Sequence, residues 1–237
     1  MTPTSAPRAV ESALVTGGSR GIGFAIAQAL ASAGASVAIT GRDETALETA
    51  RRKLGGHTLA LHADVRDAQA AAGAVDAAAG RFGGLDLLVN NAGVGVFAAV
   101  ADMTPDAWRQ VIETNLSGVF YCCHAAIPHL RKRGGGWIIN ISSLAGKNAF
   151  VNGAAYCASK SGLNAFSEAL MQEVRHENIR VSYVMPGSVS TGFMGRSQGA
   201  DEWKLAAEDV AQAVMDLVAH PARSLPSRIE IRPSKPR

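Results

Sequence analysis

Short runs of aliphatic and β-branched residues alternate along the chain with longer segments in which apolar residues recur every three or four positions. The short runs are typical of buried strands, and the longer segments have the period of amphipathic helices. The predicted strands cover residues 13–16, 36–40, 58–62, 85–90, 137–141, 181–185 and 228–232. The predicted helices cover residues 22–33, 44–54, 68–82, 105–131, 154–176 and 208–219. This alternation predicts an α/β fold with a doubly wound, parallel, seven-stranded sheet between two helical layers.

Glycine-rich segments separate several predicted helices from the strands that follow them. They lie at residues 55–56, 83–84 and 134–136. Glycine ends helices readily because it adopts the left-handed backbone of a C-cap. With 237 residues, 47% of them hydrophobic, the chain can bury a substantial core, and no internal repeat interrupts it. We therefore expect one domain over residues 1–237.

The charge and hydropathy patterns argue against several classes of partner. The 23 basic and 20 acidic residues give a formal net charge of +3, and the basic residues are scattered. A nucleic-acid-binding protein would gather them on one face. No apolar run approaches the roughly 18 residues of a membrane span, and the first residues lack a signal-peptide pattern. We expect a cytoplasmic protein without nucleic-acid or membrane partners.

The cysteines and histidines give no sign of a metal site or a disulfide framework. Cys122, Cys123 and Cys157 lack metal-ligand spacing, and the six histidines do not cluster. We expect buried, reduced thiols and no metal. For Cys157, which follows a candidate catalytic tyrosine, a reactive thiol stays open as the alternative.

The first predicted strand leads directly into a glycine-rich turn that opens the first helix. The turn contains Gly17, Ser19, Arg20, Gly21, Ile22 and Gly23. Gly17 allows a tight turn, whereas Gly21 and Gly23 would let backbone amides and the helix N-terminus approach a pyrophosphate without a Cβ in the way. The spacing is G-x-x-x-G-x-G rather than G-x-G-x-x-G, but its place between strand and helix is that of a dinucleotide-binding turn. We predict a Rossmann fold that binds a nicotinamide dinucleotide.

The end of the second predicted strand indicates which dinucleotide is bound. An acidic residue at this place binds the free ribose 2′-hydroxyl of NAD. Here the chain has Gly41 and Arg42, and Arg20 can reach the same region. Two guanidinium groups favour a 2′-phosphate through charge-assisted hydrogen bonds, so we predict NADP(H). Asp43 and Glu44 leave open that a carboxylate turns back towards the ribose.

Three polar residues have a spacing that suits proton transfer to a carbonyl oxygen. Tyr156 and Lys160 lie one helical turn apart on one face of a predicted helix, and Ser143 follows a predicted strand. A nearby ammonium group favours the phenolate, so we expect Lys160 to lower the pKa of Tyr156. The alternative is a surface lysine over a half-buried tyrosine.

In this order, the motifs resemble those of the short-chain dehydrogenase/reductase family, and the resemblance extends over residues 13–219. It rests on the glycine turn, segment 90–93, Asn115, Ser143, Tyr156, Lys160 and segment 186–191. The resemblance implies that Tyr156 is the general acid in carbonyl reduction and the base in alcohol oxidation, while Ser143 positions the substrate oxygen. It also implies that Lys160 binds the nicotinamide ribose and that Asn115 holds a water linking Lys160 to solvent. An ordinary helix-kinking asparagine is the alternative for Asn115.

The same resemblance implies cofactor contacts outside the glycine turn. These are Asp64 and Val65 at the adenine, Asn91, Ala92 and Gly93 at the adenosine and ribose, and Pro186, Gly187, Val189 and Thr191 around the nicotinamide. For Asp64, capping of the next helix is the alternative.

The loops after the predicted strands are expected to form the substrate walls. They contribute Gly95, Val96, Phe97, Leu144, Ala145, Asn148, Val151, Asn152 and a lid near 192–206. Most of these residues are apolar, and a plain flexible loop is the alternative for the lid. Arg196 and Lys204 in the lid could attract an acidic or carrier-bound acyl group.

The resemblance implies a homodimer or homotetramer that pairs the helices near 105–131 and 154–176. Many tetrameric relatives end in a glycine-rich apolar strand, whereas segment 229–237 carries charges and prolines, so both states stay open. We expect an enzyme that reduces a ketone or aldehyde with NADP(H). Two alternatives are a 3-oxoacyl-[acyl-carrier-protein] reductase and a non-catalytic NADPH-sensing protein.

Overall fold

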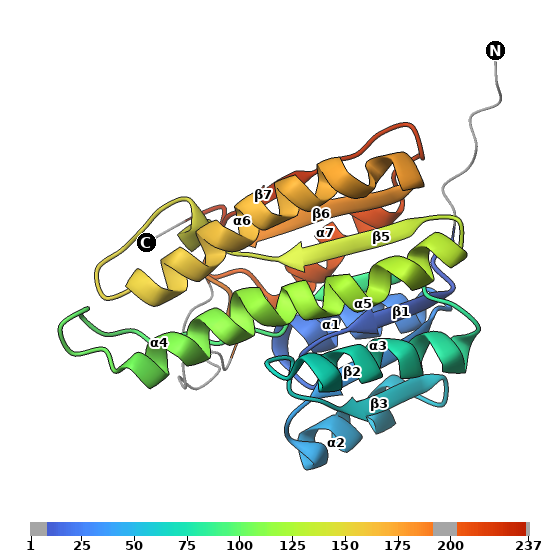
Figure 1. Ribbon diagram of the computed structural model, residues 1–237, viewed down its shortest axis with the longest axis horizontal. Helices are drawn as coiled ribbons and strands as arrows, with labels where there is room; N and C mark the ends of the chain where they lie inside the picture. Colours follow the sequence, from blue (N-terminus) through green and yellow to red (C-terminus); the bar gives the residue numbers. More distant parts are fainter. Residues whose placement is uncertain (1–8, 192–202, 236–237) are drawn as a thin grey trace.

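The computed structural model describes residues 9–191 and 203–235 and is built around a parallel sheet of seven strands (Figure 1). Their order across the sheet is β3-β2-β1-β4-β5-β6-β7. The strands are β1 (Ser12–Val15), β2 (Ser36–Gly41), β3 (Thr58–His62), β4 (Leu87–Asn90), β5 (Gly136–Ile141), β6 (Ile179–Pro186) and β7 (Arg228–Ile231). The predicted doubly wound, seven-stranded sheet is thus confirmed, and every strand begins and ends within two residues of its predicted position.

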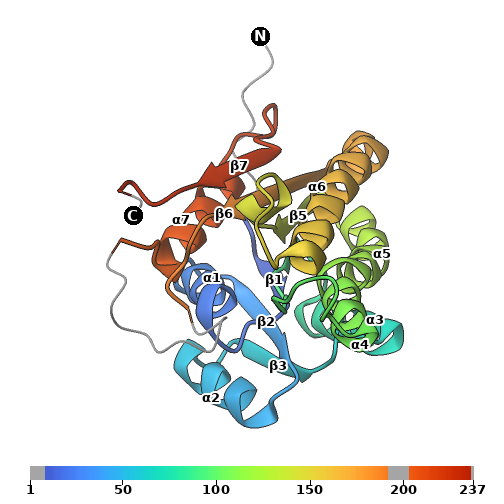
Figure 2. The same cartoon turned by 90° about the vertical axis from the view of Figure 1, so that its left-hand side faces the viewer.

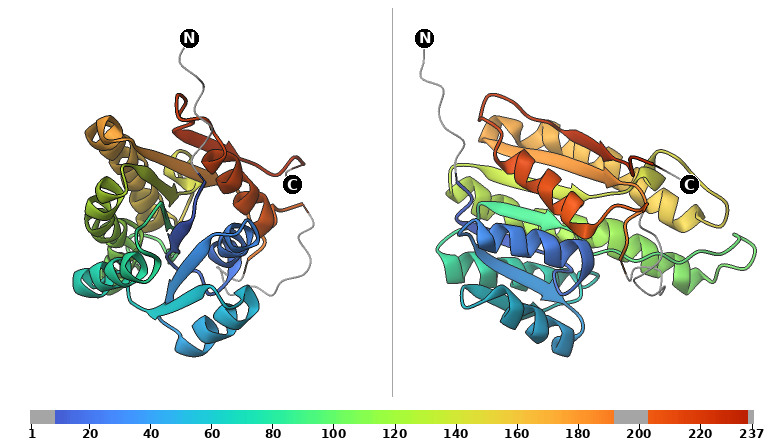
Figure 3. Two further views of the ribbon diagram at one scale, coloured as in Figure 1. Left: turned by 90° about the vertical axis from the view of Figure 1, so that its right-hand side faces the viewer. Right: turned by 180° about the vertical axis from the view of Figure 1, so that it is seen from behind.

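Helices cover both faces of the sheet and form the two outer layers (Figure 2). They are α1 (Gly21–Ser32), α2 (Glu44–Leu54), α3 (Ala68–Phe82), α4 (Pro105–Ile112), α5 (Gly118–Lys132), α6 (Ala154–Val174) and α7 (Ala207–Val218). Helices α3, α5 and α6 lie in front of the sheet in Figure 1, and α1, α2 and α7 lie on the opposite face, seen from behind in Figure 3. This is the predicted three-layer arrangement.

The sheet separates two hydrophobic cores. Along β1, Ala13 and Val15 face the core formed with α1, α2 and α7, whereas Leu14 faces the core formed with α3, α5 and α6. Every residue of β1 and β4 is buried. A parallel sheet covered on both faces needs apolar side chains at successive positions, which explains the continuous apolar runs in the sequence.

The strand order brings the predicted functional segments to one edge of the sheet. Strand β1 lies between β2 and β4, so the chain winds outwards in both directions from this point. The register pairs Val15 with Val89 and Val89 with Ile139. Segments 16–18, 91–93 and 142–143, which follow these strands, therefore meet at the carboxyl edge, where open α/β sheets bind their ligands.

The predicted continuous helix 105–131 is wrong in one respect, because a π-helical turn at Glu113–Ser117 separates α4 from α5. Asn115 lies in this turn and is fully buried. A π-turn inserts an extra residue into a helical pattern and is often found at functional sites. Gly118 follows the turn, and a Cβ there would lie 2.9 Å from Val65 Cγ2, so the start of α5 packs directly against the loop after β3.

Candidate active site

The glycine turn after β1 is tied to the segment after β4 by four hydrogen bonds. The Thr16 hydroxyl accepts the backbone N–H groups of Asn91 and Ala92, both at 3.0 Å. The Asn91 side chain donates to the carbonyl oxygens of Thr16 and Gly17 at 3.0 and 3.1 Å. Asn91 thus shapes the turn, whereas a contact of Asn91 or Ala92 with the cofactor stays a prediction.

The glycines of the turn differ in what surrounds them. A Cβ on Gly23 would lie 2.3 Å from Asn91 Nδ2 and 2.4 Å from the Gly17 carbonyl oxygen, so Gly23 is needed for packing inside the turn rather than for access of a phosphate. Gly17 is similarly close to Ala92 and has a φ of +63°. Among the described residues, Gly21, with a φ of +56°, has only the Thr191 side chain near its missing Cβ, at 3.5 Å. Of these three, Gly21 has the most space around its missing Cβ among the described residues, so it is the one that stays a candidate for the approach of a pyrophosphate.

The N-terminus of α1, which includes Ile22 in its first turn, fits an anion. Arg20 occupies its N-cap position and makes no side-chain capping hydrogen bond. By contrast, Asp43, Asp67 and Thr104 cap α2, α3 and α4. The first amides of α1 therefore receive no side-chain cap from the described residues, and their N–H groups and the helix dipole suit the pyrophosphate of a dinucleotide.

The side chains predicted to select the cofactor lie around the end of β2. Arg20 and Arg42 are exposed, and Ser19 Oγ lies 3.4 Å from the position of a Cβ on Gly41. Asp64 follows β3 nearby, with one carboxylate oxygen 4.0 Å from Arg42 Nη1.

The two residues predicted at the adenine differ in burial. Val65 is 7% exposed, and its side chain packs at Gly118. The side chain of Asp64 is 30% exposed, so of the two it is the carboxylate that can reach a ligand.

The segment after β6 closes the other side of the site. Thr191 lies against Gly21, and the Gly187 N–H donates to the Ile231 carbonyl oxygen at 2.8 Å. Val189 forms an isolated bridge with Leu205. Pro186, Gly187, Val189 and Thr191 therefore belong to one segment beside the glycine turn. The predicted lid at 192–206 lies outside the described residues except for 203–206.

Ser143 and Tyr156 are brought into direct contact by β5 and α6. The Ser143 side chain hydrogen-bonds the Tyr156 phenol. Ser143 Oγ also accepts the Ala145 N–H at 3.1 Å. Burial raises the pKa of Tyr156 above its ordinary value, and the Ser143 hydrogen bond offsets this only in part. The direction is opposite to the predicted lowering.

Lys160 lies one turn after Tyr156 and is 4% exposed. Its Nζ donates to the Ile141 carbonyl oxygen at 2.8 Å and lies 5.8 Å from the centre of the Tyr156 ring. Burial lowers the pKa of Lys160 to about 8. Burial therefore disfavours the positive charge that was expected to stabilise the phenolate.

Asn115 joins the loop after β4 to α6. Its Oδ1 accepts the Val94 N–H at 2.8 Å, and its Nδ2 donates to the Val94 carbonyl oxygen at 2.9 Å and to Ser159 Oγ at 3.0 Å. Both amide protons are thus in use. A Cβ on Gly93 would lie 3.4 Å from Asn115 Oδ1 and 3.7 Å from Lys160 Nζ, so Gly93 lies in contact distance of both side chains.

Two aromatic rings, those of Phe97 and Phe150, lie beside Tyr156. The Phe97 ring lies edge-on to Tyr156, with ring centres 5.6 Å apart, and Phe150 packs behind Phe97 at 5.7 Å. The Ala98 N–H donates to the Asn152 carbonyl oxygen at 3.0 Å and so links the two loops. The loop after β4, with Phe97, and the loop before α6, with Phe150 and Asn152, therefore both lie beside Tyr156.

The sequence analysis missed several residues that hold this site together. Thr16 ties the glycine turn to the segment after β4, and Ser159 accepts a hydrogen bond from Asn115. Asn140 donates from Nδ2 to Ser167 Oγ at 2.8 Å and accepts from Asn90 Nδ2 at 2.9 Å, which links β4, β5 and α6 inside the core. The sequence signal that could have identified them is a small polar residue at a position where the hydrophobic period of the strand or helix predicts an apolar one.

Within the described residues 9–191 and 203–235, no group of three or more histidine, cysteine or acidic side chains could hold a metal ion. None of the helices described there has the length and apolar character needed to cross a membrane. Cys122, Cys123 and Cys157 are buried and unbridged. Burial raises the pKa of Cys122 to about 12 and also raises that of Cys123. A reactive Cys157 thiol stays the untested alternative.

Comparison with known protein families places these motifs in a wider context. A family model described as short chain dehydrogenase matches residues 11–202. Trans-4-hydroxycyclohexanecarboxylate dehydrogenase of Sinomonas cyclohexanicum is 40% identical over 216 residues, which cover 87% of this chain and 83% of the relative. The family match includes the glycine turn and segment 143–160.

Two solved structures have the same arrangement of elements. An alcohol dehydrogenase from the archaeon Thermococcus sibiricus, complexed with 5-hydroxy-NADP, has a TM-score of 0.89 and 29% identity and covers 95% of this chain and 97% of its own. A 3-ketoacyl-(acyl-carrier-protein) reductase of Brucella melitensis, complexed with NADH, has a TM-score of 0.85 and 29% identity and covers 94% and 96%. With the family match over residues 11–202, these similarities show that the chain belongs to the short-chain dehydrogenase/reductase family.

Proposed function

We propose that the protein is an NADP(H)-dependent oxidoreductase that reversibly reduces a ketone or aldehyde to an alcohol. The observation that carries this proposal is the meeting of Ser143, Tyr156 and Lys160 with the uncapped end of α1 at one edge of the sheet. A nicotinamide dinucleotide, when bound, supplies the hydride chemistry. Two of the relatives named above are dehydrogenases of hydroxyl compounds, which favours the same class of reaction.

The protein supplies the proton and positions the substrate. The Ser143 hydroxyl holds the substrate oxygen beside the Tyr156 phenol, which donates its proton to that oxygen in reduction and removes it in oxidation. The raised pKa of Tyr156 keeps the phenol protonated near neutral pH, which suits reduction. Lys160, with a pKa of about 8, exchanges protons readily in this range and lies next to the phenol. Asn115 holds the end of β4 and α6 in register around them.

Arg20 and Arg42 are the basis for proposing NADP(H) rather than NAD(H). Both side chains are exposed at the carboxyl edge of β1 and β2, where the adenosine ribose lies in a Rossmann fold. Asp43, which could have taken the ribose hydroxyls, accepts the Ala46 N–H at 2.9 Å as the cap of α2. The alcohol dehydrogenase relative carries an NADP analogue, whereas the Brucella reductase carries NADH, so the preference needs a direct test.

Turnover of a panel of ketones, aldehydes and 3-oxoacyl thioesters, followed by the loss of NADPH or NADH absorbance, tests the proposal. We expect reduction with NADPH at a higher kcat/KM than with NADH. Tyr156→Phe should lower kcat by at least about a thousandfold and leave NADPH binding intact, because it removes only the acidic proton. Substantial turnover by Tyr156→Phe would contradict the assigned role.

Two alternative functions have distinct outcomes in the same panel. Reduction confined to 3-oxoacyl thioesters would favour the acyl-carrier-protein reductase activity named for the Brucella relative. NADPH binding without oxidation by any carbonyl would favour a sensing protein. The complete set of acid, amine and positioning hydroxyl argues against this last alternative, because a binding protein has no need of them.

We also propose a homodimer formed through α5 and α6. A groove between these helices is lined by Leu116, Ser117, Phe120, Tyr121, Gly162 and Phe166. Phe120 is 48% exposed and contacts the rings of Tyr121, His124 and Phe166. An exposed aromatic cluster of this kind is typical of an interface between subunits.

A further inference from the structure

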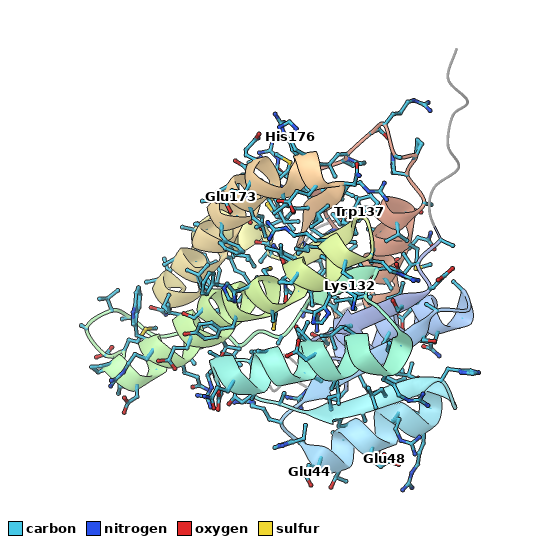
Figure 4. The ribbon with its side chains drawn as sticks, turned by 45° about the vertical axis from the view of Figure 1, so that its right-hand side comes forward. Glu44, Glu48, Lys132, Trp137, Glu173 and His176 are labelled. Atoms are coloured by element: carbon cyan, nitrogen blue, oxygen red, sulfur yellow. The ribbon has the colours of Figure 1, made fainter. Side chains whose placement is uncertain are left out.

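Of the three acidic side chains near Arg42, those of Asp43 and Asp64 are held by hydrogen bonds to other groups. Asp43 and Glu44 follow Arg42 in the chain, and Asp64 comes just after β3, the strand that pairs with β2. Asp43 caps α2, and Glu44 is 79% exposed on the solvent side of α2, 3.9 Å from His62 Nδ1 (Figure 4). Neither carboxylate is therefore directed at the Arg42 guanidinium, and the remaining competitor is Asp64.

Asp64 lies between two arginines and is engaged by one of them. Arg66 donates from Nε to both carboxylate oxygens at 3.1 and 2.9 Å, and from Nη2 at 2.6 Å. The Arg66 backbone N–H adds a bond of 3.0 Å to Oδ1. Arg42 Nη1, by contrast, approaches no closer than 4.0 Å. The Arg66 hydrogen bond is the largest influence on the Asp64 carboxyl and holds its pKa below the ordinary value.

A carboxylate and a phosphate compete for the same guanidinium group. Arg42 pairs with a 2′-phosphate best when its N–H donors are not already bound to an acid. If Arg66 were absent, the Asp64 carboxylate would be left 4 Å from Arg42 with no stronger partner nearby. It would then neutralise Arg42 and repel the phosphate.

We propose that Arg66 is a positioning residue for NADP(H) selection, which holds Asp64 away from Arg42 and so leaves Arg42 for the 2′-phosphate. This inference rests on the NADP(H) preference proposed above. Arg66 need not touch the cofactor, because it acts through Asp64. The proposal also predicts that a positive charge at position 66 is not enough to hold Asp64, because the bidentate geometry of the guanidinium group is needed as well.

The test measures the dissociation constants of 2′,5′-ADP and 5′-AMP for the full chain by titration calorimetry. These ligands differ only in the 2′-phosphate and need no turnover, so the ratio of their constants isolates phosphate recognition. Arg66→Ala should weaken 2′,5′-ADP about tenfold and change 5′-AMP by less than about twofold. Arg66→Lys should reduce the preference for 2′,5′-ADP over 5′-AMP several-fold. The double variant Asp64→Asn/Arg66→Ala should restore the wild-type preference.

Arg51→Ala is the matched control, because Arg51 makes a similar two-pronged pair with Glu48 on α2 at 2.7 and 2.8 Å. It should leave the ratio unchanged. An unchanged ratio in Arg66→Ala, wild-type behaviour of Arg66→Lys, or no restoration by Asp64→Asn would overturn the positioning role while the wild type still prefers 2′,5′-ADP. A wild type that binds 5′-AMP as tightly as 2′,5′-ADP would instead overturn the NADP(H) assignment, and the role of Arg66 with it.

Discussion

Burial decides the protonation of the two central side chains. Tyr156 and Lys160 lie against each other, and burial raises the pKa of the phenol and lowers that of the amine. Both shifts favour the neutral form, because a charge loses solvation when it leaves water. In this state the site holds a protonated acid next to an amine that titrates near pH 8, a combination suited to delivering a proton and recovering it.

The buried amine has a measurable consequence for stability. Since the pKa of Lys160 is lowered to about 8, the unfolded chain binds more protons than the folded one between pH 8 and its ordinary value of 10.5. Stability therefore rises with pH in this window. We expect the unfolding free energy of the wild type, relative to Lys160→Met, to rise by about 2 kcal/mol between pH 7.5 and pH 9.5.

Urea unfolding of the cofactor-free proteins at several pH values measures this difference. Lys132→Met is the matched control, because Lys132 lies exposed on α5 (Figure 4) and its ammonium stays in water. It should show no comparable rise. If the difference in unfolding free energy between the wild type and Lys160→Met does not change over this pH range, Lys160 is not desolvated in the folded protein.

The strand and helix ends at the edge opposite the site are held together by a buried acid. Asp86, just before β4, accepts the Glu11 and Ser12 N–H groups and the Ser12 hydroxyl, each at 3.1 Å. Arg133, at the end of α5, donates from Nε to its other oxygen at 2.9 Å. Burial alone would raise the pKa of Asp86, but these partners hold it below the ordinary value. One carboxylate thus connects β1, β4 and α5.

Removal of the arginine should expose the cost of burying that acid. We expect Arg133→Met to lower the unfolding free energy by about 2 kcal/mol at pH 7, a value reduced from that of a fully buried pair because Arg133 is partly exposed. Because the pKa of Asp86 is lowered in the folded state, its contribution is lost as the pH falls, so the difference from wild type should shrink towards pH 3. Urea unfolding at both pH values checks this.

The control for this pair is Arg52→Met, since Arg52 is 75% exposed and bonds Glu48 on the surface of α2. A surface pair contributes little, and we expect a change below about 0.5 kcal/mol. Equal effects of the two substitutions would contradict a special role for the buried carboxylate.

In the whole molecule, one helical face carries an aromatic cluster of which Phe120 is exposed. Helices α5 and α6 lie side by side on the outside of the sheet (Figures 1 and 2), and their groove contains Phe120 and Phe166. Helix α6 also carries Tyr156 and Lys160 on its buried face. A second copy seated in the groove would therefore restrain the helix that holds the candidate acid.

A charge in the groove should separate the subunits. Phe120→Arg places an unpaired guanidinium group in the proposed apolar interface, which is strongly unfavourable. We expect a dimer for the wild type and a monomer for Phe120→Arg by light scattering after size exclusion. Val100→Arg, on a loop outside the groove and 75% exposed, is the control and should stay dimeric. A monomeric wild type would refute the assembly.

The sequence predicted the sheet, the glycine turn and the Ser143, Tyr156 and Lys160 set well, but not the details that depend on distant neighbours. The inner strands were predicted correctly because strands such as β1 and β4 are buried along their whole length and their apolar runs are continuous. The π-turn at Glu113–Ser117 was missed because Asn115 is stabilised by Val94 and Ser159, which are far away in the chain. The function predicted for Gly23 shifted for the same reason, since its neighbour is Asn91.

The amino-acid sequence alone specified which residues lie at the end of each strand. Hydrophobic period, glycine backbone freedom and one-turn helical spacing each depend on only a few neighbouring residues. The electrostatic state of the residues at the strand ends was decided only by the tertiary structure. The pKa of Tyr156 was expected to fall and instead rises, because burial sums over loops and helices that meet only after folding. The approach of Arg42 to Asp64, at 4.0 Å, likewise depends on the pairing of β2 with β3, which residue order does not contain.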